Sequence, residues 1–143
     1  MKELYIVGFD ETDASSRAVD FATERASASG GSVMVLYVLE WSPYSFLTNE
    51  ELAERHARRK DELGRAEQML EPVVERVRGA GVECEALVRY GDPAELICKA
   101  ASERNATQIL VGRAGDSSFK SRFLGSLVVT LAQASPVPLT VVP

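Results

Sequence analysis

Five short apolar segments alternate along this chain with four longer segments in which apolar residues recur at helical spacing. The apolar segments cover residues 4–9, 33–39, 82–88, 107–111 and 139–142. Because helical segments rather than tight turns connect them, these strands must be joined by crossovers and pair mostly in parallel. The order predicts an α/β fold, a single-domain, doubly wound, five-stranded, mostly parallel sheet with helices on both faces, which is Rossmann-like.

Local signals mark where the predicted helices begin and end. The first helix opens near Asp13 and stops at Gly30. The third begins at Pro93 with Asp92 as its N-cap, and the last covers 125–134. The long second helix, 49–78, is charged on most of its surface and has one apolar stripe. The stripe consists of Leu63, Ala66, Leu70, Val73 and Val77.

Length and charge narrow the class of protein. With 143 residues, 45% of them hydrophobic, the chain can bury one core, and no linker or internal repeat divides it. We therefore expect one domain over 1–143. Sixteen Lys and Arg against 21 Asp and Glu leave a net charge of −5. A protein that binds the phosphate backbone normally has a basic excess, so no nucleic-acid partner is expected.

The chain also lacks the features of a membrane or disulfide-rich protein. Its longest apolar run, 33–39, is far shorter than the roughly 20 residues that a membrane span needs. The first residues do not resemble a signal peptide, so we expect a cytoplasmic protein with no membrane partner. Cys84 and Cys98 have no metal-binding spacing and lie in apolar patterns, which predicts two reduced, buried thiols.

The most informative loop follows the fourth predicted strand. Gly112 ends that strand, Gly115 lies three residues later, and Gly125 and Ser126 begin the last helix. Glycine permits a positive φ and lets backbone N–H groups approach an anion closely. The first N–H groups of a helix are unpaired and carry partial positive charge. This spacing favours a phosphate site with Arg113 and other basic residues nearby, although ordinary turns and caps also use such glycines.

The same loop carries a family resemblance. The pattern G-x2-G-x9-G-[S/T], formed by Gly112, Gly115, Gly125 and Ser126, resembles the nucleotide-binding signature of the universal stress protein family, ATP-binding type. The opening IVGFDETDAS resembles that family's first strand and aspartate, and VMVLYVLE resembles its second strand. The ending PVPLTVV is similar to its last strand. The resemblance therefore spans nearly the whole chain.

The resemblance implies a set of nucleotide contacts. The family's aspartate, which contacts the ribose or adenine side, falls on Asp10, and its adenine-contacting valine falls on Val38. Backbone contacts beside the aspartate are implied for Gly8 and Phe9. The phosphates would be held by Gly112, Gly115, Gly125 and Ser126. The residues flanking these are Val111, Arg113 and Leu127.

The resemblance further implies a function and a partner. The expected ligand is an adenine nucleotide, ATP or else AMP or ADP, and Asp10 could help to hold Mg²⁺. A homodimer through the C-terminal strand is implied, because pairing covers an exposed sheet edge. Two departures add negative charge: Glu11-Thr12 replaces the family's frequent Gly-Ser, and Asp116 follows Gly115. The sequence leaves open which of the three nucleotides is preferred.

Three alternatives to a nucleotide-binding stress-response module remain. One is a slow ATPase, because Asp10 could help hold a metal and Arg113 could meet the γ-phosphate, although no residue stands out as a base that orients water. Another is an interaction protein of the same fold that binds no nucleotide. The acidic pair Asp10-Glu11 also fits a response-regulator receiver, but the aspartate that would close the third strand, Asp92, is better explained as an N-cap.

Overall fold

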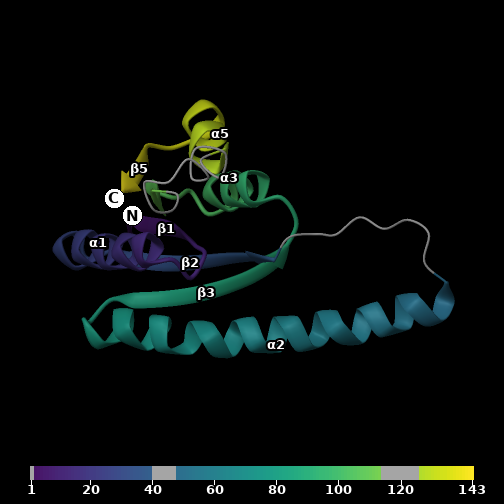
Figure 1. The fold of residues 1–143 in the computed structure, drawn as a ribbon. Helices are drawn as coiled ribbons and strands as arrows, with labels where there is room; N and C mark the ends of the chain where they lie inside the picture. Colours follow the sequence, from purple (N-terminus) through teal and green to yellow (C-terminus); the bar gives the residue numbers. More distant parts are fainter. Residues whose placement is uncertain (1, 40–47, 114–125) are drawn as a thin grey trace.

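We describe a computed structural model of residues 2–39, 48–113 and 126–143. Within these residues, helices and strands alternate in the predicted order (Figure 1). The elements are β1 (Leu4–Phe9), α1 (Asp13–Ser29), β2 (Ser32–Leu39), α2 (Asn49–Gly79), β3 (Glu83–Tyr90), α3 (Pro93–Glu103), β4 (Gln108–Gly112), α5 (Ser126–Ala134) and β5 (Leu139–Val142). The bounds agree with the prediction to within one or two residues, with Asp92 capping α3 as expected.

The five described strands form one parallel sheet in the order β3-β2-β1-β4-β5. One face packs against α1 and α2, and the other packs against α3 and α5, as Figure 1 shows. From the central strand β1, the strands β2 and β3 follow toward one edge of the sheet. The strands β4 and β5 follow toward the opposite edge. Ligands of open parallel sheets bind at such a reversal, beyond the carboxyl ends of the strands. Here that place lies between β1 and β4.

Polar and apolar residues alternate along β3 because this strand lies at an edge of the sheet. β3 is an edge strand, and only one of its faces is fully covered, so Cys84 and Val88 are buried while Glu83 and Glu85 are exposed. Glu83 pairs with Lys2 at 2.6 Å, and Glu85 accepts a hydrogen bond from Arg104 at 2.9 Å. The inner strands are apolar on both faces because helices cover both.

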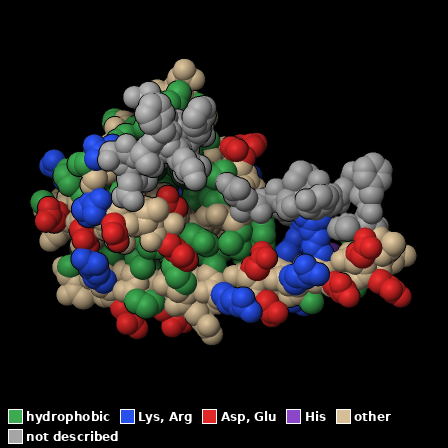
Figure 2. All heavy atoms as spheres, viewed as in Figure 1, with side chains coloured by type: hydrophobic (Ala, Val, Ile, Leu, Met, Phe, Trp, Pro, Cys, Tyr) green, Lys and Arg blue, Asp and Glu red, His purple; other side chains and the backbone are tan. Residues whose placement is uncertain are grey.

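Helix α2 is longer than the sheet that it covers. Its 31 residues span about 46 Å, whereas the eight residues of β3 span about 26 Å. The buried residues all lie in its second half, and the first half extends beyond the sheet (Figure 1). Charges of both signs are interspersed along its exposed surface (Figure 2). The predicted stripe needs one correction, since Val74 is buried and Val73 and Leu63 are only partly buried.

None of the helices in the described part of the chain is both long and apolar enough to cross a membrane. The two thiols differ in their surroundings, contrary to the expectation that both are buried. Cys84 lies in the core beneath α2, with 6% of its surface exposed, whereas Cys98 on α3 is only partly buried. Burial raises the pKa of the Cys84 thiol to about 11, and a weaker burial raises the pKa of Cys98.

This difference predicts unequal thiol reactivity. The thiolate is the reactive form, and at about pH 8 roughly one Cys84 in a thousand would be ionised. We expect a Cys98→Ser variant, which retains Cys84, to react with a thiol reagent about tenfold or more slowly than a Cys84→Ser variant. Reaction rates measured by absorbance in native buffer test this. Equal rates in the two folded variants would contradict the burial of Cys84.

Candidate functional site

The carboxyl ends of β1 and β4 bring together most of the predicted site. Gly8 stands opposite Val111 in the β1–β4 pairing, so Asp10 and Arg113 emerge side by side after the two strands. Phe9 pairs with Tyr37 of β2, which places Val38 just beyond it. The described part of α5 begins at Ser126, in the segment that returns to β5. Gly115 and Gly125, two of the predicted phosphate-binding residues, lie outside the described residues.

A ring of hydrogen bonds shapes the turn between β1 and α1. Thr12 is the N-cap of α1, and its hydroxyl accepts from the Ser15 N–H at 3.1 Å. The same hydroxyl donates to Asp10 Oδ1 at 2.5 Å, and the Thr12 N–H donates to that oxygen at 3.1 Å. Ser15 Oγ accepts from the Asp10 N–H at 3.3 Å and donates to the Thr12 carbonyl at 2.9 Å. The Asp10 carboxylate is therefore held through one oxygen.

Glu11, which lies between Asp10 and Thr12 in this turn, has a backbone conformation that is unusual for a residue other than glycine. Glu11 has a φ of +67°, in the left-handed region that glycine adopts readily and other residues do at a cost of about 1–3 kcal/mol. This explains why a glycine suits the position after the aspartate, where the sequence departs from the family pattern. The Glu11 side chain is exposed. Its charge therefore lies at the rim of the site rather than in the core.

Gly112 is required by packing against α1. An added Cβ would lie 2.5 Å from the backbone carbon of Ala14 and 2.5 Å from the backbone nitrogen of Ser15. Among the described residues, the glycines with positive φ are Gly30, Gly81 and Gly91, so Gly112 does not use that freedom. The residue allows β4 to approach the first turn of α1, whatever further role its backbone has.

Other site residues also contribute to the core. An added Cβ at Gly8 would meet Ile97 Cδ1 at 3.0 Å, so this glycine makes room for α3. Val111 is buried, and Val38 and Leu127 are partly buried against the α3 and α5 face. The Arg113 side chain is exposed. Its backbone N–H donates to the Val142 carbonyl at 2.6 Å, which occupies that group in the β4–β5 pairing.

The electrostatics of this edge are mixed. Asp10 and Glu11 lie after β1, and Arg113 lies after β4. Burial, followed by the negative charges of Glu11 and Asp10, raises the pKa of Tyr37. Two further residues at this edge, Ser15 and Tyr37, are not among the contact residues predicted from the sequence. The sequence features that could have indicated them are a serine in the first turn of a helix and an aromatic residue in an otherwise aliphatic strand.

The described residues contain no group of three or more His, Cys, Asp or Glu side chains that could hold a metal ion. Magnesium usually binds proteins through one or two carboxylates together with substrate phosphates and water. Asp10 is a single carboxylate, which is the kind of group that could share a Mg²⁺ with bound phosphates.

Comparison with known proteins gives the chain its family. The model of the universal stress protein family matches residues 5–143. A universal stress protein of Thermus aquaticus is 31% identical over 143 residues, with 99% of each chain covered. This chain therefore belongs to the universal stress protein family, and the resemblance seen in the sequence is confirmed at that level.

Solved structures confirm the predicted fold. The universal stress protein UspA from Lactobacillus plantarum matches with a TM-score of 0.84 at 20% identity, over 99% of this chain and 97% of that one. A universal stress protein described in complex with cAMP matches with a TM-score of 0.72 at 25% identity, over 99% of this chain and 96% of that one. Both share the parallel α/β architecture.

The packing of Gly112 generates a stability prediction. A Gly112→Ala variant should lower the free energy of unfolding by about 1–3 kcal/mol, because β4 or α1 must shift to admit the methyl group. Gly64→Ala in α2 is the control, because an added Cβ there meets nothing within 4 Å and alanine favours the helix by about 1 kcal/mol. Urea unfolding measures both, and an unchanged Gly112→Ala would refute the tight contact.

Proposed function

We propose that this chain binds an adenine nucleotide at the carboxyl ends of β1 and β4 and acts as a ligand-dependent interaction module in a stress response. The observation that carries the proposal is the placement of Asp10 and Gly112–Arg113 side by side at the reversal of strand order. Membership in the family and the structural relative described in complex with cAMP support it.

Each described residue has a chemical role in this proposal. Asp10, held through Oδ1 by Thr12, would present its carboxylate to a ribose hydroxyl or to the adenine amino group. Val38 would supply an apolar surface for the adenine ring, beside the backbone of Gly8 and Phe9. Arg113 would neutralise phosphate charge. The α5 N-terminus, which begins with Ser126, would receive a phosphate oxygen.

The charge at the site bears on which nucleotide is preferred. Glu11 on the rim repels each added phosphate, and Arg113 is the cation that follows β4. A bound Mg²⁺ would offset this repulsion for ATP more than for AMP, because it is held by the phosphates as well as by a carboxylate. We therefore propose ATP with Mg²⁺, or AMP without it, as the ligands to compare first.

The carboxylate of Asp10 provides the direct test. We expect Asp10→Asn to weaken nucleotide binding by roughly tenfold or more, because a charge-assisted hydrogen bond becomes a neutral one and the amide can turn its donor toward the ligand. Asp13→Asn, three residues along and exposed, makes the same charge change and should bind almost as the unaltered chain does. Calorimetric titration with ATP and AMP, with and without Mg²⁺, measures the affinities.

The protein must be stripped of co-purified nucleotide before this titration. Chromatography of the denatured, freshly purified chain identifies what it carried. Equal affinities of the two asparagine variants would remove Asp10 from the site. If the unaltered chain bound neither nucleotide, the proposal itself would fail, and the interaction protein without a nucleotide would be the better account.

We also propose that two copies pair through β5. The Arg113 N–H donates to the Val142 carbonyl and the Ile109 N–H donates to the Pro138 carbonyl, so these alternate residues face β4. Leu139 and Val141 then direct their backbone groups to the open side of the strand. The Val141 side chain is 38% exposed, an apolar surface that a second copy would cover.

A proline at this strand tests the pairing. Val141→Pro should abolish or strongly weaken dimerisation, because it removes an N–H on the open side while the β4–β5 hydrogen bonds given by the neighbouring residues remain. Val141→Thr retains the N–H and the branched shape and should remain dimeric. Sedimentation measures the association state of each folded variant. A dimer that survives Val141→Pro would place the interface elsewhere.

A further inference from the structure

The sheet has a second edge, β3, and this one is longer. β3 has eight residues and β5 has four, and both are terminal in the strand order (Figure 1). An edge strand presents unpaired N–H and C=O groups on which another strand can add, and long edges carry the greater risk. How the β3 edge is protected therefore bears on which surface of this protein can associate.

The hydrogen bonds identify which groups of β3 point outward. The Gly91 N–H donates to the Leu39 carbonyl at 3.1 Å, so the odd-numbered residues here face β2. Backbone groups of alternate residues point to opposite sides of a strand, so those of Cys84, Ala86 and Val88 point to the open side. These are the groups that an added strand would engage.

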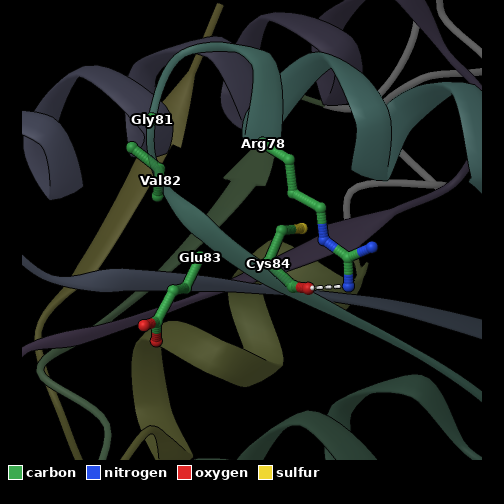
Figure 3. A pocket seen from close by; sticks show the side chains of 5 residues that line it. All are labelled: Arg78, Gly81, Val82, Glu83 and Cys84. Atoms are coloured by element: carbon green, nitrogen blue, oxygen red, sulfur yellow. Dashed lines mark hydrogen bonds between the residues drawn. The ribbon is translucent and has the colours of Figure 1, made fainter.

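One outward carbonyl is already occupied by the end of α2. Arg78 lies in the last turn of that helix, and its Nη2 donates to the Cys84 carbonyl at 2.9 Å. Figure 3 shows the side chain reaching from the helix to the strand. It lies at a shallow pocket of about 330 Å³. The pocket is lined by Arg78, Gly81, Val82, Glu83 and Cys84. The guanidinium therefore lies where an added strand would run.

A second outward carbonyl is occupied from the strand itself. Arg89 Nη1 donates to the Val88 carbonyl at 2.8 Å. Two of the outward carbonyls, four residues apart, thus accept from a charged guanidinium. We propose that Arg78 and Arg89 close the β3 edge to strand addition by a second copy of this chain. An added strand would have to break two charge-assisted hydrogen bonds and displace both guanidinium groups.

The charges on the strand's face are a separate obstacle and do not account for the carbonyl contacts. Glu83 pairs with Lys2 and Glu85 with Arg104, so both carboxylates are partly neutralised within the molecule. Like other strand side chains, they project from a face of the sheet rather than along its edge. Arg89 also starts from a face, but its Nη1 turns back to the outward Val88 carbonyl. The two arginines act on the edge itself, which makes their effect separable by mutation.

The test compares two double variants with equal charge. Arg78→Ala with Arg89→Ala should give concentration-dependent association beyond that of the unaltered chain, seen as a rise in weight-average mass by sedimentation. Arg58→Ala with Lys99→Ala also removes two positive charges. Each of these forms an ion pair one turn away on its own helix, Arg58 with Glu54 and Lys99 with Glu103, so this variant should sediment like the unaltered chain. Circular dichroism and urea unfolding check that every variant is folded.

A third substitution assigns any association to the edge. Adding Ala86→Pro to the arginine double variant removes an outward N–H and leaves the β2–β3 hydrogen bonds in place, so the mass should fall back to that of the unaltered chain. A folded double variant that associates no more than the unaltered chain would overturn the proposal. So would association in the charge control, or association that survives Ala86→Pro. If the double variant did not fold, each single arginine variant would be judged by the same criteria.

Discussion

The close approach of β4 to the first turn of α1 is the contact on which the site depends. At Gly112 the two backbones are so near that a Cβ would lie 2.5 Å from atoms of Ala14 and Ser15. This contact sets the distance between the end of β4 and the turn that carries Asp10. A side chain at Gly112 would push the helix away from the sheet. It would then separate the two groups that the proposed nucleotide would contact together.

Side-chain hydrogen bonds from Ser15 and Thr12 stabilise the turn between β1 and α1. Ser15 is the polar residue with a buried side chain in the described core, and its hydroxyl connects the Asp10 N–H to the Thr12 carbonyl. Thr12 caps α1 and holds one oxygen of Asp10 at the same time. The left-handed backbone of Glu11 is sustained by these contacts on both sides. Local strain of this kind persists where the surroundings over-determine it, which is common at binding sites.

The two edges of the sheet are built differently. β5 is short and directs the exposed side chain of Val141 and the backbone groups of alternate residues outward. β3 is long, and arginine side chains occupy outward carbonyls at two of its residues. A parallel sheet of this order always has two edges, and pairing through β5, as proposed, leaves the β3 edge to be protected. In the proposal above, the two arginines supply that protection.

The order of strands and helices could be predicted from the sequence because the elements have distinct apolar patterns. Capping residues such as Asp92 and Pro93 also mark where a helix begins. Local patterns also located Asp10 and Gly112 at strand ends. Only the tertiary structure decided which strands are neighbours, and with it that β3 is an edge and that Cys98 is less buried than Cys84. Likewise, no local pattern could reveal that Gly112 is small because α1 lies against it. Burial and close approach depend on contacts between residues that are distant in the chain. The apolar period of a single segment carries no information about those contacts.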